Sequence, residues 1–307
     1  MIRKYKSPVI YMGGKYDILE YIDAVLPKEI YTFYDVFGGS FNVGGNITAK
    51  NIVYNDINPK MSELISYLYN NISSDIVSNI EKRIKDFGLV RRNTESYRKF
   101  REEYNSNQNP LDLFILHCYS FMHGFMFNLK GMYNCPCGDS EYNHRTKSNI
   151  INFCGNIQQK TIEFYNLDFK DIIKTAINSK TIGKDVIYCD PPYITTYAFY
   201  NISDTQWTEN SEKTLYELLK QYGDKGGLFV VSNVFKHRNK ENPFVIEFSK
   251  DYNVYHIKNK KYRKVDQKFR TIIKTDECET DEVLITNIQN SKNLNIFKHQ
   301  IVRNNLW

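Results

Sequence analysis

Seven short segments rich in β-branched and aromatic residues recur along the chain and predict buried strands. They cover residues 31–36, 52–55, 161–165, 185–189, 228–232, 254–257 and 282–286. Between several of them, apolar residues recur at helical spacing: Ile18, Ile22, Val25 and Leu26; Met61, Leu64, Ile65 and Leu68; and Leu215, Leu218, Leu219 and Tyr222. The alternation predicts an α/β fold with a seven-stranded, mainly parallel sheet that helices cover on both faces.

This alternation stops between residues 59 and 155. One helical stripe lies there, formed by Ile76, Ile80, Ile84 and Phe87. A basic stretch over residues 91–101 follows, then an apolar segment over 111–127 that predicts a further helix. Residues 128–138 are rich in turn formers and predict a hairpin or loop. We therefore expect residues 59–155 to be a helical domain inserted into a domain made of 1–58 and 156–307.

Composition and charge exclude two classes of protein. The most apolar segment, 111–127, contains Asp112, His117 and His123 and is shorter than the ~18 apolar residues that a membrane span needs. The N-terminus lacks the apolar stretch of a secretory signal. Lys and Arg number 41 against 35 Asp and Glu, and the net charge of +6 favours a polyanionic partner. We expect a cytoplasmic protein without a membrane partner.

The sharpest chemical signal is the run Asp190, Pro191, Pro192, Tyr193, directly after the predicted strand 185–189. Ligands bind outside the carboxyl ends of strands in such sheets. The Asp190 carboxylate and the Pro191 carbonyl can accept both hydrogens of an exocyclic amino group and aim its lone pair at an activated methyl group. The prolines stiffen the turn, and Tyr193 offers a flat face to an extruded base. An ordinary strand-ending turn is the alternative.

A second signal is the strand that runs from Asp35 into a glycine turn at Gly38 and Gly39, where a ligand can approach the backbone closely. Asp56 follows Asp35 by 21 positions, the spacing of an acid that binds ribose hydroxyls. A helix N-cap is the alternative for Asp56. No G-x-G-x-x-G motif occurs, which argues against a dinucleotide.

Two weaker signals flank these. Gly13, Gly14 and Lys15 can hold a carboxylate or phosphate, or form a surface turn. Asp168 and Phe169 can bind and stack an adenine, or cap a helix and fill the core.

Together these motifs resemble the DNA adenine-N6 methyltransferases of the Dam type, especially the compact phage forms, over nearly the whole chain. Tyr11 to Lys15 is similar to the family's aromatic-x-G-G-K, and Asp190 to Tyr193 is similar to its catalytic motif. The order of cofactor loop, insert and catalytic motif is the family's α arrangement. The resemblance implies a Rossmann-like class I methyltransferase fold, with the insert as a DNA-recognition domain. It implies S-adenosylmethionine contacts at Tyr11, Lys15, Asp35, Phe37, Gly38, Gly39, Ser40, Asp56, Asp168, Phe169 and Asp190.

The sequence departs from the family pattern at two places. Phe41 stands where the cofactor loop F-x-G-x-G has its second glycine. In the recognition loop, Met126 stands where enzymes specific for G-A-T-C carry an arginine, and methionine cannot make the two hydrogen bonds by which Arg reads guanine. Phe121 keeps an aromatic ring where relatives insert one into the base stack. The DNA contacts expected in the insert are Phe121, Met122, Met126, Asn128, Lys130 and Pro136.

A basic cluster near the C-terminus includes Lys260, Lys261 and Lys264. These lysines can grip DNA phosphates beside the active site. A solvated hairpin between the last two strands is the alternative.

We therefore expect methyl transfer from S-adenosylmethionine to N6 of a flipped adenine in double-stranded DNA, at G-A-T-C or a variant of it. The setting would be a prokaryotic cell or a phage-infected host, with a cognate restriction endonuclease as a further partner. No metal is expected, because no His and Cys residues show ligand spacing. The alternatives are a cytosine-N4 or RNA methyltransferase, or a catalytically silent DNA-binding relative.

Overall fold

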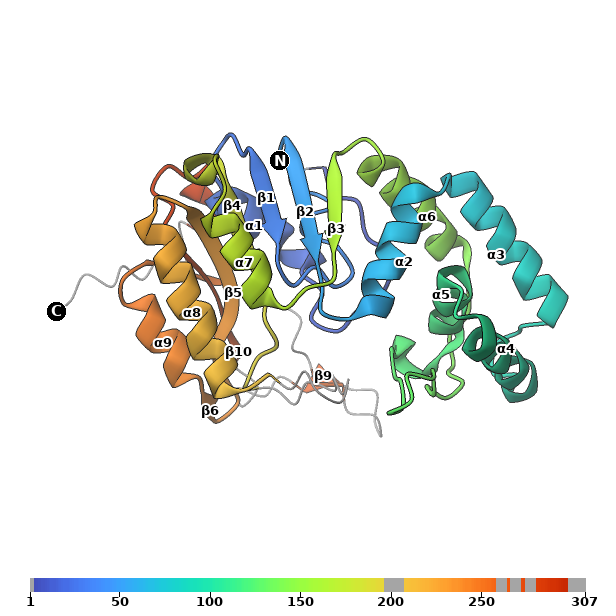
Figure 1. Cartoon of the computed structure of the whole chain (residues 1–307). Coiled ribbons are helices and arrows are strands. Elements are labelled where there is room, and N and C mark those ends of the chain that lie inside the picture. Colours follow the sequence, from blue (N-terminus) through green and yellow to red (C-terminus); the bar gives the residue numbers. More distant parts are fainter. Residues whose placement is uncertain (1–2, 196–206, 258–263, 266–271, 274–279, 298–307) are drawn as a thin grey trace. The chain divides into compact units, whose positions relative to one another are not determined.

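The computed structural model of the chain describes residues 3–195, 207–257, 264–265, 272–273 and 280–297. These residues form two compact units. The first comprises residues 3–19 and 37–169, and the second comprises 20–36, 170–195 and the described residues from 207 onward (Figure 1).

In the first unit, β2 (Asn51–Asn55) and β3 (Ile162–Tyr165) pair in parallel. The helix α2 (Pro59–Asn70) follows β2 and contacts β3. It begins at Pro59 because the Asn58 side chain accepts the Lys60 N–H at 3.0 Å and proline suits the first helical position. The predicted stripe is confirmed as its buried face: Met61, Leu64, Ile65 and Leu68.

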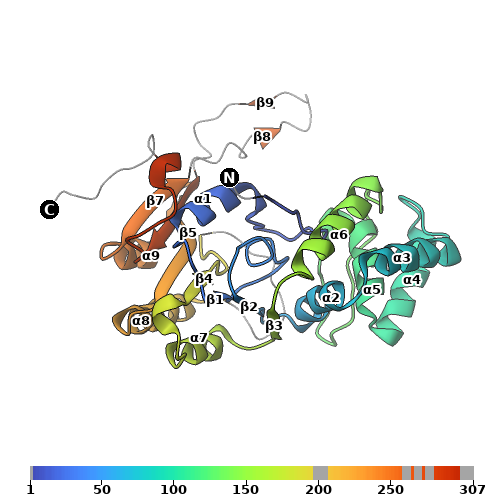
Figure 2. The same cartoon turned by 90° about the horizontal axis from the view of Figure 1, so that it is seen from above.

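Four further helices lie together in the first unit in both views (Figures 1 and 2): α3 (Ser73–Phe87), α4 (Thr94–Asn107), α5 (Pro110–Tyr119) and α6 (His144–Ile157). Asn93, Asn109 and Asn143 begin the last three, because each side chain accepts a backbone N–H of the first turn. The central helix is α5, which contacts α2, α3 and α4 and is buried from residue 111 to residue 119. Its apolar composition follows from this position.

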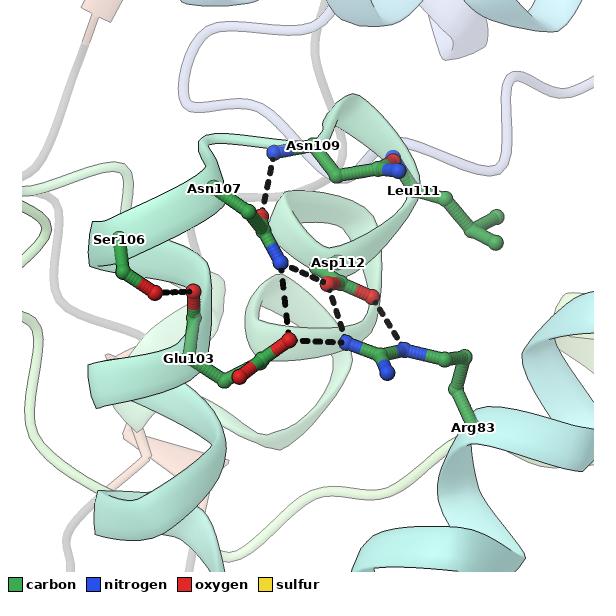
Figure 3. Close-up of polar contacts among 7 residues, drawn as sticks. All are labelled: Arg83, Glu103, Ser106, Asn107, Asn109, Leu111 and Asp112. Atoms are coloured by element: carbon green, nitrogen blue, oxygen red, sulfur yellow. Dashed lines mark hydrogen bonds and ion pairs between the residues drawn. The ribbon is translucent and has the colours of Figure 1, made fainter.

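A polar network joins α3, α4 and α5 (Figure 3). The Arg83 Nε donates to Asp112 Oδ1 at 2.9 Å, and its Nη2 donates to Oδ2 of the same carboxylate. Glu103 lies 3.5 Å from the Arg83 Nη2, and the Asn107 amide donates to both acids. The Asp112 side chain is only 3% exposed, so a bidentate arginine satisfies a buried carboxylate here.

The predicted helix over 111–127 is too long, because α5 ends at Tyr119. Ser120 is extended, and Met122 and His123 have φ values of 52° and 53°, in the left-handed region that cannot continue a helix. Residues 121–123 form only a short 3-10 turn, η2 (Phe121–His123). The predicted hairpin is present but begins before residue 128, because bridges pair residues 120 with 137 and 127 with 133, so η2 lies within it.

The second unit holds a mixed sheet in the order β1-β4-β5-β10-β7. Its strands are β1 (Thr32–Asp35), β4 (Val186–Cys189), β5 (Leu228–His237), β7 (Asn253–Ile257) and β10 (Thr280–Thr286). The first three are parallel to one another, and β10 is antiparallel to both of its neighbours. The helices of this unit are α1 (Leu19–Val25), α7 (Phe169–Ile177), α8 (Glu209–Asp224) and α9 (Pro243–Ser249).

All seven predicted strands are confirmed, and with them the α/β class. Three two-residue strands of the described chain were not predicted. One of them, β6 (Lys240–Glu241), folds back on the end of β5 through a turn in which Arg238 has a φ of 55°. A separate pair, β8 (Lys264–Val265) and β9 (Ile272–Ile273), is antiparallel. No helix in the described part of the chain has the length and apolar character of a membrane span. The division of function at residues 59 and 155 stays a prediction.

Candidate active site

Two glycines shape the loop after residue 37 in the first unit. The Gly38 N–H donates to the Asn55 carbonyl at 2.7 Å, and a Cβ at Gly38 would lie 2.4 Å from the Tyr54 ring. Gly39 has a φ of 48°, and its N–H donates to Asp56 Oδ2 at 2.8 Å. The predicted glycine turn is therefore required by close packing at one position and by a left-handed backbone at the next.

Phe41 occupies the position where the family pattern has a second glycine, and its φ is 61°. A phenylalanine thus adopts a left-handed backbone conformation that glycine adopts more readily than any other residue. Its ring is fully buried and meets the Tyr54 ring edge-on at 5.0 Å. The neighbouring Ser40 is also buried and accepts a hydrogen bond from the Asn42 amide at 2.8 Å.

Both carboxylate oxygens of Asp56, which follows β2, accept backbone hydrogen bonds. Oδ2 accepts the Gly39 N–H and Oδ1 accepts the Asn58 N–H, each at 2.8 Å. Burial raises the pKa of this carboxyl to about 6, although the two backbone hydrogen bonds act in the opposite direction. The N-cap of α2 is Asn58, so the alternative role for Asp56 as that cap is wrong. Each oxygen keeps acceptor capacity that suits a sugar hydroxyl.

Aromatic rings from two loops meet beside β2. Phe37 and Phe169 are stacked at 5.8 Å with 28° between their planes. The Asn55 side chain holds the second loop, because its Oδ1 accepts the Leu167 N–H at 2.9 Å and its amide donates to the Leu167 carbonyl at 3.1 Å. Asp168 follows in this loop and is half-buried. Phe169 is the first residue of α7 and is buried, so it fills the core as the alternative expects, and this does not prevent its ring from also stacking a base.

The N-terminal segment lies against the glycine loop. Gly13 has a φ of 79°, and the Gly14 N–H donates to the Tyr11 carbonyl at 3.2 Å, which makes a tight turn. A Cβ at Gly39 would lie 3.2 Å from the Tyr11 ring. Gly13 and Gly14 are exposed, as the surface-turn alternative expects, whereas Lys15 is only 6% exposed and donates to the Gly13 carbonyl at 2.7 Å.

The second unit carries the predicted catalytic run at the end of β4. The Tyr193 hydroxyl donates to Asp190 Oδ1 at 2.9 Å and lies 3.4 Å from the Ser232 hydroxyl on β5. Burial raises the pKa of the Tyr193 phenol well above its usual value, and the negative charges of Asp190 and Glu282 raise it further. The phenol therefore remains a donor to Asp190 at neutral pH. Pro191 is buried and Pro192 half-buried.

Asp35 ends β1, the strand beside β4. Its side chain is 2% exposed. Asp35, the last residue of β1, and Asp190, the residue directly after β4, therefore both stand at the carboxyl ends of neighbouring parallel strands, where ligands bind in open α/β sheets.

The predicted DNA contacts of the insert are exposed on its hairpin. Phe121, Met122 and Met126 are 54%, 75% and 47% exposed, which is unusual for large apolar side chains. Asn128, Lys130 and Pro136 are exposed as well. The Asn128 Oδ1 accepts the N–H groups of Lys130 and Met132 at 2.9 and 3.0 Å, so this oxygen shapes the hairpin tip.

The basic cluster is only partly described. Lys260 and Lys261 lie outside the described residues, and Lys264 begins β8, where only the backbone is described. Among the residues that the structure describes, no three His, Cys, Asp or Glu side chains gather as a metal site requires.

Two buried polar residues of the second unit were not among the predicted site residues: Ser232, which lies beside Tyr193, and Glu212. A signal was present for Glu212, which stands three and seven positions before Leu215 and Leu219 on the apolar stripe of α8. A charged residue within an apolar stripe indicates a buried and paired carboxylate.

The family model for D12 class N6 adenine-specific DNA methyltransferase matches residues 11–265, which include the predicted cofactor loop, the predicted insert and the predicted catalytic run. The chain belongs to this family. The family resemblance of the motifs is thereby confirmed.

Named relatives agree with this family. The type II methyltransferase M.FokI of Planomicrobium okeanokoites is 34% identical over 93% of this chain and 43% of its own length. Modification methylase StsI of Streptococcus sanguinis is 32% identical over 94% of this chain and 44% of its own length. The DNA adenine methylase of Escherichia coli (strain K12) is 28% identical over 66% of this chain and 70% of its own length. The chain thus spans less than half the length of the first two relatives.

Proposed function

We propose that this protein transfers a methyl group from S-adenosylmethionine to N6 of adenine in double-stranded DNA. The observation that carries the proposal is the Asp190 carboxylate at the carboxyl end of β4, held by the Tyr193 hydroxyl at 2.9 Å and followed by two prolines, in a chain of the D12 class. An acceptor fixed at the strand end is what an amino group needs to be held for reaction.

The residues of the first unit fit the proposed methyl donor. The buried Lys15 ammonium suits its carboxylate, Asp56 suits its ribose hydroxyls, and the stacked Phe37 and Phe169 rings suit its adenine. Phe41 keeps the left-handed backbone of the family loop, so this departure does not argue against cofactor binding. When bound, the donor supplies a sulfonium methyl group that is already electrophilic.

The residues of the catalytic run then act on the base. Adenine N6 is a poor nucleophile, because its lone pair is delocalised into the ring. Asp190 and the Pro191 carbonyl accept its two hydrogens and localise the lone pair on nitrogen. Positioning supplies most of the acceleration. Asp190 receives a proton only after methylation has made the nitrogen acidic. The Tyr193 ring stacks the base that has left the helix.

The insert is proposed to read the DNA through its hairpin. Exposed Phe121 and Met122 suit contact with bases rather than solvent. Met126 cannot read guanine as arginine does, so the recognition sequence is proposed to be a variant of G-A-T-C. Long-read sequencing of DNA from a strain that expresses the protein reports the methylated sequence directly, and methylation at G-A-T-C alone would contradict the altered specificity.

Two of the relatives are named modification methylases or type II methyltransferases. A restriction endonuclease that cuts the same sequence is therefore the proposed partner besides DNA. The proposed location is the cytoplasm of a prokaryotic or phage-infected cell, where the DNA substrate lies.

The activity is tested with tritium-labelled S-adenosylmethionine and unmethylated duplex DNA, followed by digestion and mass spectrometry of the nucleosides. We expect N6-methyladenine from the wild type and none from Asp190→Ala, which should keep most of its affinity for the donor because the other donor contacts are unchanged. N4-methylcytosine, or methylation of RNA only, would favour the alternative enzymes. DNA binding without any transfer would identify a silent relative.

A further inference from the structure

A buried carboxylate, Glu212 on α8, has no role in the proposed function so far. Its side chain is fully buried, and Oε1 accepts three hydrogen bonds. They come from the Tyr216 hydroxyl at 2.6 Å, the Asn242 amide at 2.7 Å and the Asn233 amide at 3.0 Å. A carboxylate is buried at a large cost unless such donors surround it. We call these four residues the Glu212 cluster.

The Glu212 cluster joins three elements that lie side by side in the second unit, α8, β5 and α9 (Figures 1 and 2). Asn233 lies on β5 and also donates to the Tyr216 hydroxyl at 3.0 Å. Asn242 is the N-cap of α9, and its Oδ1 accepts the Phe244 N–H at 3.1 Å. One carboxylate oxygen therefore fixes the carboxyl-terminal half of β5 from the side of α8.

That part of β5 also contacts the catalytic run. Ser232 precedes Asn233, is fully buried, and places its hydroxyl 3.4 Å from the Tyr193 hydroxyl. Successive residues of a strand point to opposite faces, so an anchor at Asn233 holds the backbone from which Ser232 projects the other way. Since Tyr193 donates its proton to Asp190, the Ser232 hydroxyl donates to Tyr193.

We propose that Glu212 is a positioning residue for methyl transfer. By holding Asn233 it fixes Ser232, and Ser232 fixes the Tyr193 hydroxyl that orients the Asp190 carboxylate. Glu212 touches neither the base nor the donor. The inference rests on the proposed function, because it assigns Glu212 to the same reaction. Small errors in the placement of a group that must hold a reacting atom cost rate rather than affinity.

Glu212→Gln tests the proposal, because glutamine keeps the shape but loses the charge that strengthens the three hydrogen bonds. We expect the single-turnover rate of methyl transfer to fall on the order of tenfold, with unchanged affinity for S-adenosylmethionine and for duplex DNA. Glu217→Gln is the matched control, since Glu217 is exposed on the same helix, and it should react at the wild-type rate. A wild-type rate in folded Glu212→Gln would overturn the proposal.

A second variant separates positioning from a general loss of stability. Ser232→Ala should also lower the single-turnover rate. Because Glu212 is proposed to act through Ser232, adding Glu212→Gln to Ser232→Ala should cost little further rate. If the double variant instead loses rate by the product of the two single-variant losses, Glu212 does not act through Ser232, and the proposal is overturned. A wild-type rate in Ser232→Ala would overturn it too, even where circular dichroism shows that Glu212→Gln does not fold.

Different results would contradict the proposed methyl transfer and the proposed role of Glu212. If the wild type transfers no methyl group to DNA, the proposed function is wrong. If the wild type forms N6-methyladenine and folded Glu212→Gln does so equally fast, only the role of Glu212 is wrong.

Discussion

At Phe41, two opposing effects act on one residue. A left-handed backbone costs a non-glycine residue about 1–2 kcal/mol, and glycine would remove that cost. The same substitution would delete a fully buried ring, a change that costs about 3–5 kcal/mol. Burial is the larger effect, which explains why a phenylalanine can hold a position whose backbone suits glycine.

We therefore expect Phe41→Gly to lower the free energy of unfolding by about 1–4 kcal/mol, measured by urea denaturation. Gln108→Gly is the matched control, because Gln108 also has a positive φ, of 50°, but is exposed at the end of α4. Gln108→Gly relieves the backbone strain without removing a buried side chain. The free energy of unfolding of this control should therefore be unchanged or slightly higher. A stabilised Phe41→Gly would contradict the account.

The raised pKa of Asp56 makes the stability of the fold depend on pH. Its folded pKa of about 6 lies above the ~3.9 of an unfolded aspartate, so the folded chain binds the proton more tightly. Its contribution to stability is therefore present below pH ~4 and is lost as the pH rises through about 6. Asp56→Asn does not titrate. We expect the free energy of unfolding of the wild type, relative to this variant, to fall by about 2–3 kcal/mol between pH 4 and pH 7. A flat or rising difference would contradict the shifted pKa.

Among the elements, prediction from sequence succeeded where the apolar pattern was regular. The seven strands are all present, and α2 and α8 bury the stripes expected of them. It failed where polar residues obscured the pattern. The basic stretch over 91–101 includes the first half of α4, whose Tyr97, Phe100 and Tyr104 are buried. α6 carries Ile150, Phe153, Cys154 and Ile157 at helical spacing among Asn, Ser and Thr residues, and no helix was predicted there.

The Arg83–Asp112 pair should matter to the helices of the insert. Asp112→Asn removes the charge and leaves an amide facing the guanidinium, so we expect the free energy of unfolding to fall by about 1–3 kcal/mol. The loss stays below that of a fully buried pair, because the Arg83 side chain is 27% exposed and can reach water. Asp86→Asn, at an exposed position on α3, is the control. Equal thermal stability of the two variants would show that the network contributes nothing.

At the scale of the whole molecule, the net charge of +6 favours binding to DNA without specifying where. Replacing Lys260, Lys261 and Lys264 with alanine tests the predicted phosphate contacts. If all three touch phosphates, the slope of log K against log salt should become shallower by about 2–3. Exposed lysines elsewhere, Lys180, Lys220 and Lys225, provide a control triple variant. An unchanged slope in the first variant would assign the cluster to plain solvated surface.

The sequence alone determined the α/β class and predicted the catalytic run and the cofactor-binding candidates, because these depend on local order: apolar periodicity, glycine in turns, and polar residues directly after strands. Tertiary structure alone decided the rest. It ended α5 at Tyr119, placed a phenylalanine in a left-handed backbone, and gathered Glu212, Asn233 and Asn242 around one oxygen. These features depend on residues distant in sequence, and their energy comes from burial and from hydrogen bonds that exist only once the elements have packed.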